Sequence, residues 1–273
     1  MNEQMIEELV RFTHLEKTYG YLPGMSSATV AALFGLDEAA YQDIRERFDE
    51  NARRAALELL EEGDLAGRVD RLPIGTGDVV LGIGDSITDD LQSWLEILRH
   101  LFALRRPQDD IRVINQGVSA QTTAMALRRC VGTFAAQRPD WVLCCLGGND
   151  VTRVGPEPNE PQVSPHESIE NLKAMRRIAS RLTDARWVWI SPPTFDERRA
   201  AGYPPFQMGQ SHWRNADVEA ISAFFGEQED PVVDLRAVFG LPAHPDLQGP
   251  DGVHPSLAGQ RAIARALVER LST

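Results

Sequence analysis

The chain has 273 residues, 42% of them hydrophobic and 25% charged, a composition typical of a globular protein and unlike that of a disordered chain. Its formal net charge of −12 argues against a nucleic-acid partner, and no apolar run approaches the ~18 residues that a membrane span requires. The polar, acidic start of the sequence and its odd number of cysteines predict a cytoplasmic protein with reduced thiols.

Residues 1–70 are predicted to form an N-terminal helical extension. Apolar spacing predicts a helix over residues 2–17, a short helix through Phe34, and a longer helix that Asp37 caps and that ends near Gly63. The longest of these helices carries one apolar face, formed by Tyr41, Ile44, Phe48, Ala52, Ala55, Leu59 and Leu60.

That apolar face must pack against something, because exposing each large side chain costs about 1.5–3 kcal/mol. We expect the helices to pack on the main body, where they would cover a functional site, or on a second subunit of a homodimer. A DNA-binding helix-turn-helix over residues 28–44, with Gly35 in its turn, is disfavoured, since residues 1–71 carry 15 acids against 8 bases, a net charge of −7. Residues 71–78 are predicted to be the linker that opens the main domain, residues 71–273.

After residue 78 strands and helices alternate, which predicts a parallel sheet with helices on both sides. Five almost continuously apolar runs are typical of strands buried on both faces, namely Val79–Ile83, Ile111–Ile114, Trp141–Leu146, Trp187–Ile190 and Val232–Leu235. The helices predicted between them are Asp89–Phe102, Thr122–Gln137, Pro165–Leu182, Asn215–Phe225 and Ser256–Leu271. The fold class is therefore α/β: a three-layer α/β/α sandwich around a central, mostly parallel, five-stranded sheet. In such sheets the active site lies at the carboxyl ends of the strands.

The first predicted strand runs into the sequence GDSIT, which places Ser86 on a strand-to-helix turn. A serine hydroxyl at such a turn is presented at the sheet edge, near a helix N-terminus that favours developing negative charge. The alternative is that Ser86 or Asp85 does no more than cap the helix.

Near the end of the chain, Asp251 precedes His254 by three residues on a predicted tight turn, DGVHP. A carboxylate at this spacing can accept the imidazole Nδ1–H, which leaves Nε2 free to act as a general base. A solvated pair of loop residues is the alternative interpretation.

Two loops that follow the second and third predicted strands offer hydrogen-bond donors. Gly117, in the sequence NQG, has a backbone N–H unobstructed by a side chain, and Asn149, in GGND, has a neutral side-chain amide. Together with the N–H of Ser86, these donors suit an oxyanion. Glycine and asparagine are also common turn residues, so each loop alone is ambiguous.

Taken together, the blocks GDSIT, NQG, GGND and DGVH resemble the SGNH (GDSL) hydrolase family in identity, order and rough spacing, over about residues 78–272. The resemblance implies a flavodoxin-like hydrolase fold and a serine nucleophile. It implies a catalytic triad of Ser86, Asp251 and His254. It also implies an oxyanion hole made by Ser86, Gly117 and Asn149.

The sequence departs from the family pattern in one block. Family members often read N-R-G-x-S-G-D-T-T, whereas this chain reads NQGVSAQTT, with Gln116, Ala120 and Gln121 in place of Arg, Gly and Asp. Residues 89–91 and 191–193 look like the branch that includes small esterases and carbohydrate-deacetylating esterases. The first 70 residues lie outside the resemblance.

Several other residues are predicted to be structural. Of the three cysteines, Cys130 is predicted to pack within a helix, and Cys144 and Cys145 are predicted to lie in a buried strand. None of them is predicted to be a nucleophile. His212 and Trp213 either line the site or pack within their loop. For Arg153, a surface salt bridge is preferred over contact with an anionic substrate group. No histidine shows metal-ligand spacing, so no metal and no cofactor are expected.

The sequence thus predicts a serine esterase that acts on short-chain, acetyl-like esters of a sugar or small metabolite. Its partner would be this small-molecule ester, with no nucleic acid and no membrane. A lysophospholipase or acyl-thioesterase on the same fold, and a non-catalytic binding protein of that fold, remain the alternatives.

Overall fold

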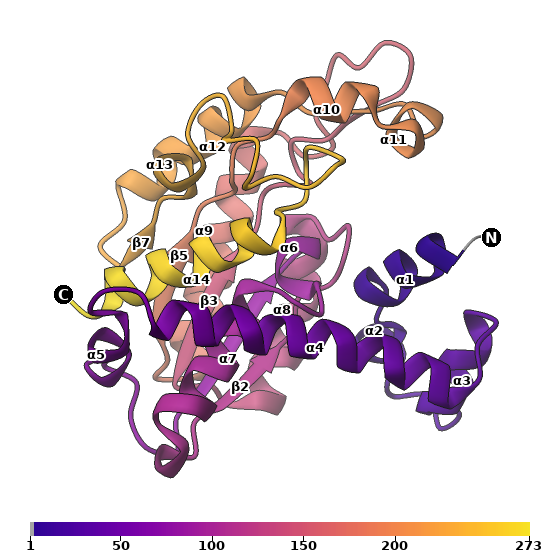
Figure 1. Ribbon diagram of the computed structural model, residues 1–273. Coiled ribbons are helices and arrows are strands. Elements are labelled where there is room, and N and C mark those ends of the chain that lie inside the picture. Colours follow the sequence, from indigo (N-terminus) through magenta and orange to yellow (C-terminus); the bar gives the residue numbers. More distant parts are fainter. Residues whose placement is uncertain (1–2) are drawn as a thin grey trace.

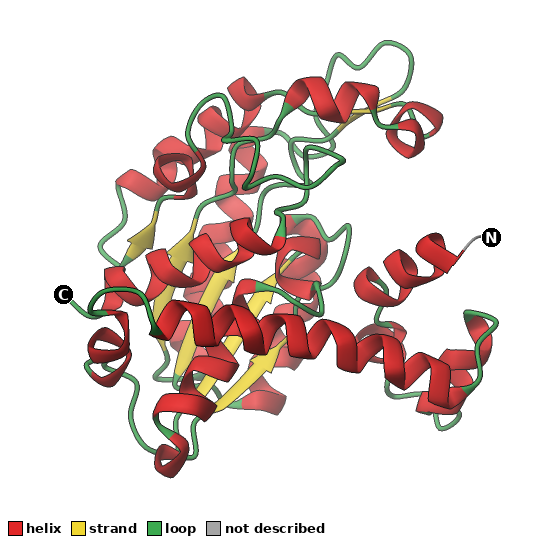
Figure 2. Cartoon of the chain, viewed as in Figure 1, coloured by secondary structure: helices red, strands yellow, loops and turns green. Residues whose placement is uncertain are grey.

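A computed structural model describes residues 3–273 of the chain. At its centre lies a five-stranded sheet, all of its strands parallel, in the order β2-β1-β3-β5-β7 (Figure 2). The strands are β1 (Val79–Gly84), β2 (Arg112–Asn115), β3 (Trp141–Cys145), β5 (Arg186–Ile190) and β7 (Val232–Val233). Each coincides with one of the five apolar runs, so the predicted three-layer α/β sandwich is confirmed.

Each face of the sheet buries its own apolar core, because successive strand side chains point to opposite sides. In β1, Val80 belongs to one core and Leu81 to the other. The first core is covered by α7 (Trp94–Arg105), α13 (Leu235–Phe239) and α14 (Leu257–Leu271). The second is covered by α8 (Thr123–Gln137), α9 (Pro165–Leu182) and α12 (Asn215–Gly226).

The N-terminal segment is helical, as predicted, and packs on the body of its own chain. Its helices are α1 (Glu3–Phe12), α2 (Leu15–Tyr19), α3 (Ser27–Leu33), α4 (Glu38–Leu60) and α5 (Leu65–Asp70). The long helix α4 runs past α7 and α14, and its C-terminal half buries Ala52, Ala55, Ala56 and Leu59 in the same core as those helices (Figure 1). Ion pairs join α14 to this segment, from Arg261 to Glu58 in α4 and from Arg265 to Glu62 in the turn that follows α4.

The N-terminal half of α4 supports a third, smaller apolar cluster to one side of the sheet (Figure 1). Its buried members come from α1, α3, the turn after α3, and α4, and they are Val10, Val30, Ala31, Phe34, Tyr41 and Ile44. The start of α4 is fixed as predicted, since the Asp37 side chain accepts from the N–H of Ala40 at 2.8 Å. One helix therefore connects the cluster at one of its ends to the main core at the other. The boundary at residues 70–71 stays a prediction.

Two predicted helices are broken in the structure. In the described part of residues 2–17 the chain turns between Phe12 and Leu15, where α1 ends and α2 begins. The predicted helix Asp89–Phe102 is replaced by the short α6 (Ser86–Asp89) and by α7. The break occurs because Asp90 adopts an extended conformation, with ψ of 127°, before Ser93 caps α7. Helical spacing of apolar residues could not reveal either turn.

The predicted linker and loops also contain more structure than expected. Leu72 and Ile74 are buried in the main core, so residues 71–78 are not a free linker. The segments that follow β3 and β5, two proline-rich loops, contain a small antiparallel pair, β4 (Arg153–Val154) and β6 (Ser211–His212), with α10 (Glu197–Gly202) and α11 (Pro204–Met208) beside it. A 3₁₀ turn, η1, spans Pro107–Asp109. Among the helices described, none combines the length and apolarity needed to cross a membrane.

Candidate active site

Ser86 stands where β1 passes into α6, at the carboxyl edge of the sheet. The strand must end in glycine, because a Cβ at Gly84 would lie 2.1 Å from Thr88 Oγ1 and 2.8 Å from the Cys145 carbonyl oxygen. Asp85, not Ser86, caps the helix by accepting from the N–H of Ile87 at 3.0 Å. The Ser86 hydroxyl is therefore available for another partner.

That partner is His254, whose Nε2 lies 2.9 Å from Ser86 Oγ. The other ring nitrogen, Nδ1, is 2.6 Å from Asp251 Oδ2. Asp251 is itself held by the backbone, since its Oδ1 accepts from the N–H groups of Val253 and His254, both at 2.9 Å. Gly252 permits this turn with φ of 71°, where an added Cβ would lie 2.5 Å from the Asp196 carbonyl oxygen. The structure thus brings Ser86, His254 and Asp251 together, although 168 residues separate Ser86 from His254.

The charges of the Asp251–His254 pair reinforce each other. Burial alone would raise the pKa of Asp251, but the hydrogen bond and the charge of His254 hold that pKa below its usual value. Burial alone would lower the pKa of His254, yet the hydrogen bond and charge of Asp251 raise it. Because Nδ1–H donates to the carboxylate, the lone pair of Nε2 faces the serine. This arrangement suits proton transfer from Ser86.

A pocket of about 390 Å³ opens in front of these residues. Asn149 lines it from the loop after β3, and its Nδ2 donates to the Gln121 carbonyl at 3.3 Å, which leaves its second amide hydrogen for a ligand. The neighbouring Asp150 is buried and accepts from the N–H of Thr123 at 2.9 Å and from Ser168 Oγ at 2.8 Å. Asp150, which sequence reasoning left without a role, therefore fixes the loop that carries Asn149.

The structure places Gly117 away from this pocket. Its N–H already donates to Asn115 Oδ1 at 3.0 Å, in a turn closed by the asparagine side chain. Ala120, three residues later, lines the pocket instead and has φ of 61°, a left-handed conformation that costs an L-residue about 1–2 kcal/mol. Neither the Ala120 N–H nor the Ser86 N–H donates to another described residue. The prediction that chose Gly117 as a donor facing the ligand does not agree with this geometry.

An aromatic wall closes the pocket on the side of the proline-rich loops. Phe195, Phe206 and Trp213 line it, and the Trp213 ring centroid lies 4.5 Å from that of Phe206. His212 is exposed on β6, so of the predicted pair only Trp213 contributes to the pocket. Arg153 forms a salt bridge, as predicted, but the residue is buried and not at the surface. Its guanidinium donates two hydrogen bonds to the Asp217 carboxylate, at 2.7 and 2.8 Å.

The three cysteines take no part in the pocket, whereas Asp85 lines it beside Ser86. All three cysteines are buried, as predicted, and burial raises the pKa of each thiol, which keeps it protonated and inert. Burial also raises the pKa of Asp85 to about 7. Within residues 3–273, no group of three or more His, Cys, Asp or Glu side chains could hold a metal ion.

Two pocket residues come from the N-terminal helical segment, which is expected to cover a functional site but carries no motif that identifies individual residues. Phe12 and Thr13, at the turn between α1 and α2, line the same pocket as Ser86. The Phe12 ring centroid is 4.8 Å from that of His254. No motif marks these residues, and their position depends on contacts with residues far along the chain.

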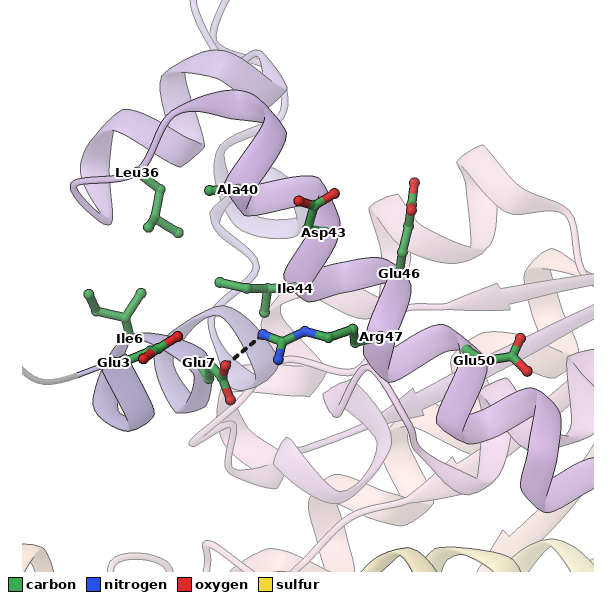
Figure 3. Close-up of a pocket in the computed structure, with 10 residues that line it drawn as sticks. All are labelled: Glu3, Ile6, Glu7, Leu36, Ala40, Asp43, Ile44, Glu46, Arg47 and Glu50. Atoms are coloured by element: carbon green, nitrogen blue, oxygen red, sulfur yellow. Dashed lines mark hydrogen bonds and ion pairs between the residues drawn. The ribbon is translucent and has the colours of Figure 1, made fainter.

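A larger hollow, of about 840 Å³, lies between α1 and α4 (Figure 3). Its floor is apolar, with Ile6, Leu36 and Ile44, while its rim carries five carboxylates and Arg47, which pairs with Glu7 at 2.6 Å. Among the described residues that line it there is no serine, cysteine or histidine. Volume alone would favour this hollow, but the reactive side chains are in the smaller pocket.

Ser86, His254 and Asp251 lie within a match to a known protein family. The model of the GDSL-like lipase/acylhydrolase family matches residues 83–262. An acetylxylan esterase of Geobacillus stearothermophilus is 26% identical over 219 residues, which cover 73% of this chain and 96% of that protein. Esterase TesA of Pseudomonas aeruginosa is 28% identical, over 66% of this chain and 81% of its own length. A protein of Escherichia coli (strain K12) named thioesterase 1/protease 1/lysophospholipase L1 is 25% identical, over 71% and 83%.

Solved structures share the fold. The structure of Axe2, an acetylxylan esterase from Geobacillus stearothermophilus, matches with a TM-score of 0.57 and 24% identity, over 73% of this chain and 96% of that one. LAE5, a hydrolase from the metagenome of Lake Arreo, Spain, matches with a TM-score of 0.56 and 21% identity, over 72% and 96%. The family match begins at residue 83, so helices α1–α5 lie outside it.

Proposed function

Because the chain belongs to the GDSL-like lipase/acylhydrolase family and is a carboxylic ester hydrolase, we propose that it cleaves short-chain, acetyl-like esters of a sugar or small metabolite through Ser86. The observation that carries this proposal is the unbroken hydrogen-bonded series Ser86–His254–Asp251, with distances of 2.9 and 2.6 Å, in which Ser86 and His254 line a pocket.

In the proposed reaction, Ser86 Oγ attacks the ester carbonyl carbon while His254 Nε2 takes the hydroxyl proton. The tetrahedral intermediate collapses as His254 returns this proton to the leaving alcohol oxygen, and an acyl–serine ester remains. Water then attacks the acyl group with His254 again as the base, which releases the carboxylic acid and restores Ser86. Asp251 holds the imidazole in the required tautomer and stabilises the imidazolium that forms in each half of the reaction.

The developing oxyanion needs donors that are in place before the reaction, since each donor is worth about 2.7–4 kcal/mol in comparable sites. We assign this role to the N–H of Ser86, the N–H of Ala120 and the side-chain amide of Asn149. Ala120 replaces Gly117 in the assignment because the N–H of Gly117 already donates to Asn115 Oδ1. The left-handed backbone at Ala120 supports this choice, because such strain persists where the surrounding structure requires it.

The pocket supports a compact substrate. Its volume of about 390 Å³ is at the small end of ligand sites, and the rings of Phe195, Phe206 and Trp213 offer apolar faces to a sugar or similar ring. The alignment covers 96% of the acetylxylan esterase relative, and this similarity supports acetyl esters of a sugar as the substrate class.

The first experiment measures hydrolysis of 4-nitrophenyl esters by the full chain and by Ser86→Ala. We expect the variant to keep its fold and to lose about 10⁴–10⁶ in kcat, because the nucleophile and its base act as one unit. Ser222→Ala is the matched control: this hydroxyl donates to the Val218 carbonyl on α12 and lies outside the pocket, so its rate should match the parent. If Ser86→Ala keeps more than about a tenth of the parent rate, the assignment fails.

The second experiment varies the acyl chain from acetyl to decanoyl with the alcohol held constant. Acetyl or butyryl esters should give the highest kcat/KM, because the pocket is small and partly lined by aromatic rings. A preference for acyl chains of eight or more carbons would instead support the alternative of a lysophospholipase or acyl-thioesterase, to which the relatives' names also point.

A further inference from the structure

The turn between α1 and α2 reaches into the candidate active site from outside the family match. We propose that this turn, residues 11–17, is a fixed wall of the substrate pocket and that Phe12 determines which alcohol portions of an ester the pocket admits. The inference rests on the proposed function, since it assigns a part of the same site.

Phe12 lies directly against the proposed general base. Its ring centroid is 4.8 Å from that of His254, with 37° between the ring planes, and it lines the pocket together with Thr13. The guanidinium carbon of Arg11 lies over the same ring, 4.6 Å from the Phe12 centroid. The ring is half-buried, so part of its apolar surface remains available to a ligand.

Two anchors hold the turn in this place. The first is a two-fold hydrogen bond from Arg11 to Asp90, at 2.8 and 2.6 Å, and the Asp90 side chain is fully buried. The Arg11 carbonyl also accepts from the N–H of Leu91 at 3.3 Å. These contacts tie α1 to the segment that follows α6, the helix on which Ser86 stands.

The second anchor is a buried carboxylate shared between α2 and the loop after β2. Asp89 accepts from His14 Nδ1 at 2.6 Å and from Lys17 Nζ at 2.5 Å. The same carboxylate accepts from the N–H and the hydroxyl of Ser119, at 2.9 and 3.0 Å. Since Ser119 precedes Ala120, the turn is bonded to the loop that carries the proposed oxyanion donor.

The chemistry of the reaction decides which part of the substrate meets Phe12. His254 Nε2 must protonate the leaving oxygen, so the alcohol portion of the ester has to lie beside the imidazole. A ring packed on that imidazole therefore faces the alcohol and not the acyl group. With the carbonyl oxygen directed to the proposed donors Asn149 and Ala120, the acyl chain takes the remaining direction from the carbonyl carbon, away from the imidazole. Phe12 should accordingly affect discrimination between alcohols and have little effect on discrimination between acyl chains.

The test compares two pairs of esters in the full-length protein. Phenyl and 2-naphthyl acetate differ in the alcohol, whereas 4-nitrophenyl acetate and butyrate differ in the acyl group. We expect Phe12→Ala to raise the naphthyl-to-phenyl ratio of kcat/KM by about tenfold or more, the scale on which pocket contacts discriminate, with the acyl ratio almost unchanged. Phe12→Trp, which enlarges the wall, should lower the alcohol ratio and serves as the second variant if Phe12→Ala is poorly folded.

Phe34→Ala is the matched control, because Phe34 is a buried ring of the same N-terminal helical segment that does not line the pocket. It should lower the melting temperature and leave both ratios at the parent values. The inference is overturned if the Phe12 variants leave the alcohol ratio unchanged, if they change the acyl ratio instead, or if Phe34→Ala shifts the alcohol ratio as much. Parent hydrolysis that survives Ser86→Ala would reject the proposed function, a result separate from these.

Discussion

Replacement of Leu59 by alanine tests whether the N-terminal helices and the sheet unfold as one unit. Leu59 lies near the end of α4, is fully buried, and belongs to the apolar core that α7 and α14 share with the sheet. Removing a buried leucine side chain costs about 2–5 kcal/mol, and the upper half of that range applies where neighbouring helices cannot collapse into the space. Leu57, on the same helix, is 37% exposed and provides the matched control.

Thermal unfolding of Leu59→Ala and Leu57→Ala, followed by circular dichroism, gives the comparison. At about 2–4 °C per kcal/mol for a chain of this size class, a loss of about 2–5 kcal/mol means that Leu59→Ala should lower the melting temperature by about 4–20 °C. Leu57→Ala should change it by no more than about 2 °C, because exposed substitutions are usually within 0.5 kcal/mol. Ester hydrolysis should disappear over the same temperature range as the helical signal.

Either of two results would refute this reasoning. Equal melting temperatures for the two variants would mean that α4 does not contribute to the core of the sheet. Two separate thermal transitions, the first with loss of helical signal and the second, at higher temperature, with loss of hydrolysis, would mean that residues 1–70 form a separate unit.

The remaining predictions concern the pocket. Since His254 must be neutral to accept a proton and Asp251 raises its pKa above the ordinary 6.5 against the effect of burial, kcat/KM should fall toward acid with a midpoint above pH 6.5. Asp251→Asn should move that midpoint downward and reduce kcat about 10⁴-fold; an unmoved midpoint in the pH–rate profile would contradict the pairing. Asn149→Ala should reduce kcat by about 10²–10³ with little change in KM, whereas a change confined to KM in steady-state assays would remove Asn149 from the oxyanion hole.

Much of the fold could be predicted because its signals are local. The five strands were recognisable from continuous apolar runs, and the residues that follow them, such as Ser86 and Asn149, had to meet at one edge of a parallel sheet. Asp251 and His254 could be paired because three residues on a tight turn bring a carboxylate to an imidazole. These inferences need no knowledge of distant contacts.

The parts that failed depend on contacts that local spacing does not contain. Gly117 looked like an open donor, but the Asn115 side chain takes its N–H, and a motif cannot show in which direction a backbone N–H points. Phe12 reaches His254 because Arg11 binds Asp90, a contact across 79 residues of sequence. The same contact turns the chain where apolar spacing predicted a continuous helix.

The position of α4 has a consequence for the order in which the molecule is assembled during translation. The helix α4 ends at Leu60, but one of its two partner helices, α14, begins only at Leu257, so residues 61–256 are synthesised between them. At about 5–20 residues per second, roughly 10–40 s pass between the synthesis of the last residue of α4 and that of the first residue of α14. During that interval Leu59 and its neighbours lack part of their final cover, and the nascent chain offers a surface on which chaperones could act. His254, just before α14, follows Ser86 by 168 residues, so the proposed triad is complete only after translation has passed His254.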